Sequence, residues 1–179
     1  MDPDYIEKEI KILNIDVDTL ITKLEEIKAK KVFDDERTIT YLDNDEERLK
    51  NMGSVLKITD EGTIKVSLST QIDTDETEQI KFKASRRKEA IDLLGRLGFK
   101  PKAELKGRRI SFELEGIDID IDVFPEIPPF VEIDLGINET PLEDFLKTLQ
   151  IVDKERVTMS TPDVYEKYKK NFFELFKKY

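Results

Sequence analysis

Acidic and basic side chains alternate with apolar ones along several short segments, and this spacing could support chemistry. Residues 6–12 read Ile-Glu-Lys-Glu-Ile-Lys-Ile, which places Glu7, Glu9 and Lys11 on one face of an extended strand. Residues 117–123 alternate Asp with β-branched residues, and Glu132 and Asp134 share a face of residues 130–135. Carboxylates are ligands that Mg²⁺ and Mn²⁺ prefer, whereas Lys and Arg bind phosphate. The pattern indicates a site for a divalent metal and a polyanion.

Other chemistries are excluded by composition. The chain has no Cys and no His, which rules out thiol nucleophiles, imidazole acid/base triads and zinc sites built on either residue. None of the seven glycines lies in a P-loop or a G-x-G-x-x-G spacing. Catalysis therefore depends on carboxylates, cationic side chains, hydroxyls or a metal held by oxygen.

The candidate site residues fall into two groups. The carboxylates are Glu7, Glu9, Glu76, Glu78, Asp120, Asp122, Glu132 and Asp134. The basic residues are Lys11, Lys57, Lys65, Lys106 and Arg108, with Arg109, Lys81 and Lys83 on neighbouring positions whose facing stays open.

About eight strands and four helices must position these side chains. The strands are expected near 6–12, 37–42, 54–59, 63–69, 76–83, 105–114, 117–123 and 130–135, and Asp60-Glu61-Gly62 predicts a hairpin turn. Helices are predicted from Asp16 or Asp18 to Ile27, from Ser85 to Gly98, from Thr140 to Leu149, and from Thr161 to Phe176. Sequential short strands favour an antiparallel meander.

The helices decide which side of this sheet is charged. Their wide apolar faces need a surface to pack on, so the apolar strand faces should point outward to the helices. The charged faces would then line the interior. We expect an α+β fold, an eight-stranded antiparallel β-barrel or tunnel with a charged lumen and helices packed outside.

The order of the charged motifs resembles a known family. Glu7-x-Glu9-x-Lys11 is similar to the E-x-E-x-K signature of the CYTH, or triphosphate tunnel metalloenzyme, superfamily. The later motifs follow in family order: Leu56-Lys57-Ile58-Thr59 for L-R-I-R, Glu76-x-Glu78 for the central acidic pair, Lys106-Gly107-Arg108 for K-x-R, Asp122 for the late strand Asp, and residues 130–134 for F-x-E-I-E.

The resemblance implies roles for these residues. The metal ligands would be Glu7, Glu9, Glu78, Asp122, Glu132 and Asp134, holding Mg²⁺ or Mn²⁺. The triphosphate would be held by Lys11, Lys57, Lys65, Lys106 and Arg108, and Glu7, Glu9 and Lys11 would be the catalytic core. The partner would be a triphosphate such as ATP, thiamine triphosphate or inorganic tripolyphosphate.

Two positions depart from the family pattern. Thr59 stands where a second Arg is expected, and Ser67 stands where a Lys usually follows on the next strand. The prediction is a metal-dependent triphosphatase that releases phosphate. The alternatives are a class IV adenylyl cyclase, which converts ATP to cyclic AMP and pyrophosphate, and a non-catalytic binder of nucleotide or polyphosphate.

The remaining expectations concern the whole chain. Its 179 residues fit one CYTH-like domain over 1–179, and 40 acidic against 30 basic residues give a net charge of −10. With an acidic N-terminus and no long apolar run, we expect a cytoplasmic protein that binds neither membrane nor nucleic acid. The basic stretch around residues 81–88 is interpreted as a solvated surface. Aromatic residues at helical spacing after residue 164 are expected in the core or at a homodimer contact.

Overall fold

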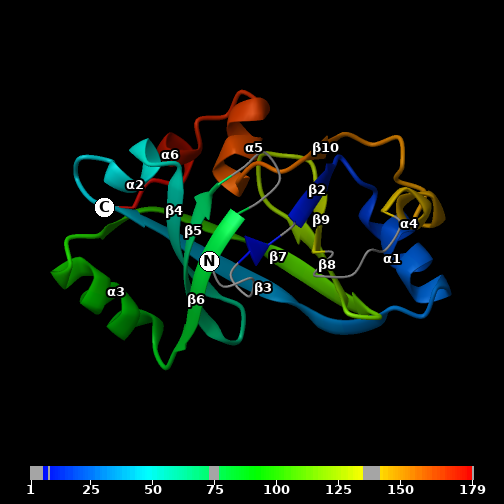
Figure 1. Ribbon diagram of the computed structural model, residues 1–179, viewed down its shortest axis with the longest axis horizontal. Coiled ribbons are helices and arrows are strands. Elements are labelled where there is room, and N and C mark those ends of the chain that lie inside the picture. Colours follow the sequence, from blue (N-terminus) through cyan, green and yellow to red (C-terminus); the bar gives the residue numbers. More distant parts are fainter. Residues whose placement is uncertain (1–5, 8, 73–76, 135–141, 179) are drawn as a thin grey trace. The chain divides into compact units, whose positions relative to one another are not determined.

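The computed structural model describes residues 6–7, 9–72, 77–134 and 142–178. The strands are β1 (Ile6–Glu7), β2 (Glu9–Leu13), β3 (Lys30–Asp43), β4 (Ser54–Asp60), β5 (Ile64–Gln71), β6 (Thr77–Ala84), β7 (Lys100–Leu114), β8 (Ile117–Val123), β9 (Phe130–Asp134) and β10 (Arg156–Val157). The helices are α1 (Val17–Glu26), α2 (Arg48–Asn51), α3 (Arg87–Arg96), α4 (Leu142–Thr148), α5 (Thr161–Lys167) and α6 (Phe172–Leu175) (Figure 1).

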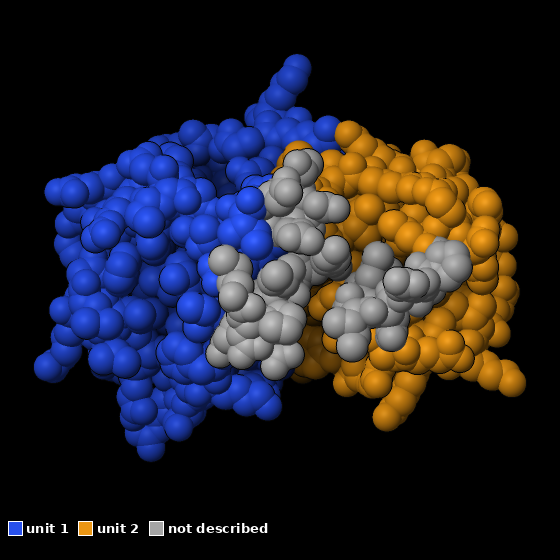
Figure 2. Space-filling model, viewed as in Figure 1, with its two compact units in different colours: residues 1–7, 36–106, 160–179 blue, residues 8–35, 107–159 orange. Residues whose placement is uncertain are grey.

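The chain divides into two compact units, each made of separate stretches of sequence (Figure 2). Unit 1 comprises residues 1–7, 36–106 and 160–179, and unit 2 comprises residues 8–35 and 107–159. The long strands β3 and β7 contribute residues to both units. The single domain expected over residues 1–179 stays a prediction.

The sheet of unit 1 has the strand order β1-β6-β5-β4-β3. Its strands pair antiparallel, and the hairpin between β4 and β5 turns at Gly62, which has a positive φ of 78°. One face of this sheet packs on α3 through a cluster that includes Leu56, Ile58, Val66 and Ala90. Tyr41 packs edge-on against Phe172 of α6, with ring centroids 5.0 Å apart.

The sheet of unit 2 has the order β7-β8-β9-β2-β10, again antiparallel. Ile110, Ile121, Val131 and Ile12 lie in one row across four strands and are fully buried. They pack in one core cluster with buried residues of α1 and α4, such as Leu20 and Leu146. The opposite face of the same strands carries the charged residues, because side chains alternate along a strand.

The predicted fold class, α+β with an antiparallel sheet covered by helices, is confirmed. The described residues form ten strands rather than eight, since residues 6–7 and 9–13 are separate strands, β1 and β2, and since β10 adds a two-residue strand. Gly107, in β7, allows close packing, because a Cβ there would clash with the Phe124 ring. Within the described ranges, no helix is both long and apolar enough to span a membrane.

Three helix predictions are confirmed and one is corrected. Asp16 caps α1 by accepting a hydrogen bond from the Thr19 amide at 2.8 Å. The helix expected from Thr161 to Phe176 is instead two short helices. Lys169 adopts a positive φ of 59°, and the Asn171 side chain accepts from the Glu174 amide, which starts α6 anew. The apolar pattern does not predict α2, whose amides at Leu49 and Lys50 donate to the carboxylate of Asp43.

Candidate functional site

The polar face of unit 2 is assembled by cross-strand pairing. Ser111, Asp120, Glu132 and Lys11 form one row across β7, β8, β9 and β2. The next row holds Glu113, Asp118, Asp134 and Glu9. Residues directly opposite each other in a sheet point to the same side. Five sequence-predicted residues therefore share one face: Glu9, Lys11, Asp120, Glu132 and Asp134.

Lys11 is the first of two buried cations on this face. It is 5% exposed, its ammonium donates to Glu9, and it lies 3.3 Å from Glu132. Burial alone would lower the pKa of Lys11, but the charges of Glu9 and Glu132 outweigh burial and raise it. Lys11 is therefore a fixed positive charge beside two carboxylates.

Arg109 is the second buried cation, and the sequence left its facing open. Its guanidinium binds Asp122 through two hydrogen bonds, Nε to Oδ1 at 2.8 Å and Nη2 to Oδ2 at 2.5 Å, and it also donates to Asp120 and Glu132. Burial opposes the charged form of Arg109, yet the facing carboxylates, Asp122 first, raise its pKa further above the ordinary value. Burial also raises the pKa of Asp120, although Arg109 acts against this shift.

Asp122 binds the guanidinium of Arg109 in this structure. It is fully buried, and both of its oxygens accept from Arg109. A carboxylate that accepts two hydrogen bonds from a guanidinium fixes the orientation of that guanidinium. The metal role that the family resemblance implied for Asp122 thus stays a prediction, and the geometry gives it an anchoring role.

Arg108 lies on the other face of β7 from Arg109. Arg108 is opposite Val123 in the pairing of β7 with β8, and its guanidinium pairs with Asp34, the Nε to Oδ1 distance being 2.8 Å. The strand alternation therefore separates Arg108 from the carboxylates of Asp122 and Glu132. Lys106, two residues earlier, is exposed. The cation that binds Asp122 is therefore Arg109, one residue after the Arg108 of the predicted Lys106-x-Arg108 motif.

The remaining predicted residues lie in unit 1. Lys57 of β4 is opposite Ser67 of β5, and Lys65 of β5 binds Glu61 at 2.6 Å. Glu78 of β6 is opposite Thr70, on the face that alternates away from Lys57. The backbone of Glu7 pairs with Thr77, and Glu76 lies outside the described residues.

The carboxylates on the polar face of unit 2 are ligands of the kind that a hard divalent cation prefers. Asp118, Asp134 and Glu9 stand directly opposite one another on three adjacent strands, which brings three carboxylates to one face of the sheet. All their donor atoms are oxygens, as Mg²⁺ and Mn²⁺ require. In the part of the chain that the structure describes, no group of three or more acidic side chains is arranged to hold a metal ion.

Comparison with known proteins identifies the family. The CYTH domain model matches residues 5–163, so the chain belongs to the CYTH family, and the resemblance seen in its motifs is confirmed. No curated protein sequence matches the chain significantly.

Solved structures share the fold at low sequence identity. A protein from Pyrococcus horikoshii has a TM-score of 0.71 and 20% identity, covering 96% of this chain and 99% of its own. A candidate adenylate cyclase from Vibrio parahaemolyticus has a TM-score of 0.74 and 16% identity, covering 90% and 98%. A Hippeastrum protein for which a dominant triphosphatase activity is stated has a TM-score of 0.60 and 13% identity, covering 92% and 96%.

Proposed function

We propose that this protein is a divalent-metal-dependent triphosphatase that acts on an inorganic or organic triphosphate and releases phosphate. The observation that carries the proposal is the polar face of unit 2, where Lys11 and Arg109 are buried among the carboxylates of Glu9, Asp120, Asp122 and Glu132. Buried charges are costly unless they are paired or bind a ligand, and a ligand that carries both signs would bind both the cations and the carboxylates of this face. A metal–triphosphate complex is such a ligand.

The proposed roles follow from charge and burial. Glu9, Glu132 and Asp134 would hold Mg²⁺ or Mn²⁺, with Glu7 from the family motif. A divalent ion of this kind neutralises phosphate charge and polarises phosphoryl oxygens. Lys11 and Arg109 bind and orient the phosphate oxygens, and Asp122 holds the Arg109 guanidinium in place. Lys57 and Lys65 of unit 1, which the family resemblance implies as phosphate ligands, stay predictions.

Hydrolysis is favoured over cyclisation. Phosphoryl transfer is achieved by positioning and charge neutralisation and needs neither His nor Cys. A cyclase must additionally orient a base and a ribose. The class IV adenylyl cyclase alternative draws on the Vibrio parahaemolyticus protein, and the non-catalytic binder draws on Thr59 and Ser67, which reduce the cations on β4 and β5.

Turnover of a substrate panel tests the proposal. Inorganic tripolyphosphate, ATP and thiamine triphosphate, each with Mg²⁺ or Mn²⁺, should yield orthophosphate. Glu9→Gln removes a ligand charge without changing shape, so turnover should fall by about a hundredfold or more, with the melting temperature retained. Glu26→Gln, on the exposed end of α1 beside Lys23, is the matched control and should turn over like the wild type.

Each other outcome has a definite meaning. Pyrophosphate with cyclic AMP as the products would establish the cyclase instead. Tight triphosphate binding without turnover in any metal would establish the binder. Wild-type turnover by Glu9→Gln would contradict the metal assignment.

A further inference from the structure

The cations of unit 1 lie in two rows across its sheet. In the first row, Tyr41, Lys57, Ser67 and Lys81 stand opposite one another on β3, β4, β5 and β6. In the second row, the corresponding residues are Ile39, Thr59, Lys65 and Lys83. Each row thus carries two Lys side chains and one Ser or Thr hydroxyl on the same face of the sheet.

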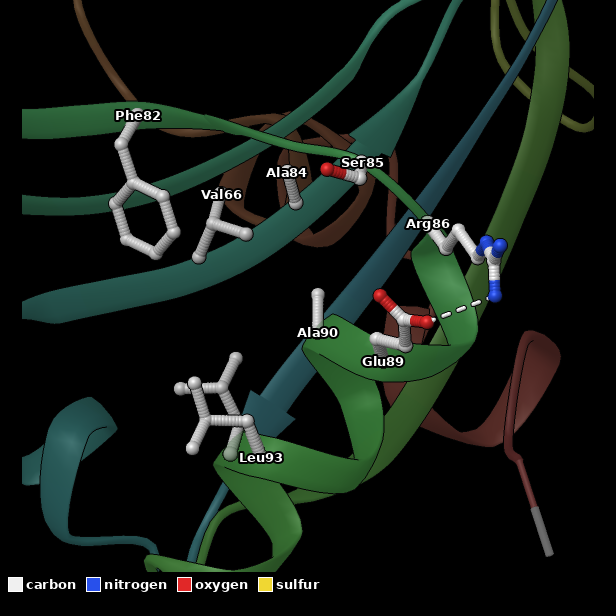
Figure 3. Close-up of a pocket in the computed structure, with 9 residues that line it drawn as sticks. Val66, Phe82, Ala84, Ser85, Arg86, Glu89, Ala90 and Leu93 are labelled. Atoms are coloured by element: carbon white, nitrogen blue, oxygen red, sulfur yellow. Dashed lines mark hydrogen bonds and ion pairs between the residues drawn. The ribbon is translucent and has the colours of Figure 1, made fainter.

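An apolar groove shows independently which face of β6 is turned toward α3. This groove is lined by Val66 of β5, Phe82 and Ala84 of β6, and Ala90 and Leu93 of α3. Figure 3 shows Phe82 and Val66 on the side of the strands toward α3. Since side chains alternate along β6, Lys81 and Lys83 point to the side away from α3.

This sidedness separates the two lysines from the rest of the basic stretch. Arg86 pairs with Glu89 at 3.0 Å, Lys88 pairs with Asp92, and Arg87 pairs with Glu104. These three residues belong to α3 or its N-cap. Lys81 and Lys83 are exposed, as expected of a solvated basic surface, but they share the face of Lys57 and Lys65 rather than the surface of α3.

The two rows also account for the departures at Thr59 and Ser67. Ser67 in the first row is directly opposite Lys81, and in the second row Thr59 is one strand from Lys65, which is opposite Lys83. Each hydroxyl therefore stands in a row that keeps two positive charges. The second charge is carried by β6 rather than by β4 or β5.

We propose that Lys81 and Lys83 bind the polyphosphate chain of the substrate, replacing on β6 the two cations that Thr59 and Ser67 lack. The inference deepens the proposed function and rests on it. Neighbouring strands are about 4.8 Å apart, and rows on one face are about 6.7 Å apart along a strand. The four ammonium groups, on flexible stems, therefore form a compact patch that matches consecutive phosphates of a linear polyanion. Lys65 and Lys83 stand directly opposite each other, and Lys65 also pairs with Glu61 at 2.6 Å.

Binding of inorganic tripolyphosphate without metal tests the inference. Isothermal titration in EDTA compares the wild type with Lys81→Gln, Lys83→Gln and the double variant. Each single change should raise the Kd about tenfold, and the double change should raise it further, because each removes a charged phosphate contact. Lys81→Arg and Lys83→Arg should retain binding. Lys88→Gln removes a charge of equal sign from the helix and should leave the Kd unchanged.

The outcomes separate this inference from the proposed function. If the Lys81→Gln/Lys83→Gln double variant binds within about twofold of the wild type while Lys57→Ala weakens binding, the triphosphate function stands and the β6 contacts do not exist. An equal loss in Lys88→Gln would mean that only the net charge matters, and would overturn the inference. A wild type that fails to bind tripolyphosphate overturns the proposed function and this inference together.

Discussion

Arg108 and Arg109 are neighbours in sequence with opposite environments. Arg109 is 8% exposed and contacts three carboxylates, whereas Arg108 is exposed and pairs with Asp34. Breaking a buried ion pair leaves uncompensated charge in a poorly solvated site, whereas a surface pair contributes little. Substituting each arginine in turn therefore tests which face of β7 binds Asp122 and Glu132.

Substitution of the two arginines by Met should have unequal effects on stability. Arg109→Met should lower the free energy of unfolding by about 3 kcal/mol, because Asp122 and Glu132 lose their partner in the interior. Arg108→Met should cost less than about 1 kcal/mol. Urea denaturation at constant m-value measures both. Equal losses would show that the face assignment is wrong.

These residues also show the reach of sequence reasoning at this scale. The alternation in residues 130–135 predicts that Glu132 and Asp134 share a face, and the pairing of β9 with β2 brings Glu9 and Lys11 to that face. The cation opposite Asp122 was not predictable, because Gly107-Arg108-Arg109 offers two adjacent arginines, and only the strand register decides which of them faces Asp122. A one-residue shift exchanges the two faces.

At the scale of elements, the C-terminal segment is attached to β7. The amide of Glu104 donates to the Phe176 carbonyl at 2.8 Å, and the Lys178 amide donates to the Lys102 carbonyl at 3.0 Å. The Glu104 carboxylate binds Arg87 of α3 and also Lys178, the latter at 3.0 Å. One carboxylate therefore connects a strand, a helix and the C-terminal segment of unit 1.

Glu104→Gln should show a pH-dependent loss of stability. Burial would raise the pKa of Glu104, but hydrogen bonds from Arg87 and Lys178 outweigh it and hold the pKa below its usual value. A depressed carboxyl pKa contributes stability above the unfolded-state pKa, and this contribution is lost as pH falls through the folded-state pKa. We expect the variant to be about 1–3 kcal/mol less stable at neutral pH.

The measurement is urea unfolding of wild type and variant from pH 7 down to pH 3. The difference in unfolding free energy should be constant at higher pH and should shrink once the pH falls below the unfolded-state value near 4.5. Glu89→Gln, at an exposed pair with Arg86, should show no such trend. A pH-independent difference for Glu104→Gln would contradict the ion-pair explanation.

Elements were more predictable than the faces they present. Periodicity located α1, α3 and α4 and the strands of the meander, since each has a clear apolar repeat. The facing of β6 is harder to predict, because polar and apolar residues alternate along Gln79-Ile80-Lys81-Phe82-Lys83 and the alternation does not say which set faces the helix. The pairing with β5 and the packing on α3 decide the facing, and both depend on residues distant in sequence.

At the scale of the whole molecule, charge is the main feature. The net charge of −10 disfavours polyanions at long range, so a triphosphate must be bound by local groups of cations. Lys11 and Arg109 in unit 2 and the lysine rows in unit 1 are such groups. The central claim is that this acidic protein binds a divalent metal and a triphosphate together, each neutralising charge that the other would otherwise face.

Thermal unfolding with stepwise ligand addition tests this claim most directly. Ligands that bind only the folded state stabilise it by about 2.7 kcal/mol at ~100 times their Kd, which corresponds to roughly 5–10 °C for a chain of this length. Mg²⁺ or Mn²⁺ alone and tripolyphosphate alone should each raise the Tm by a smaller amount, and the two together should raise it by more than the sum. Additive shifts that sodium sulfate reproduces at equal ionic strength would mean that only general salt screening acts on an exposed charged surface, and would contradict the account.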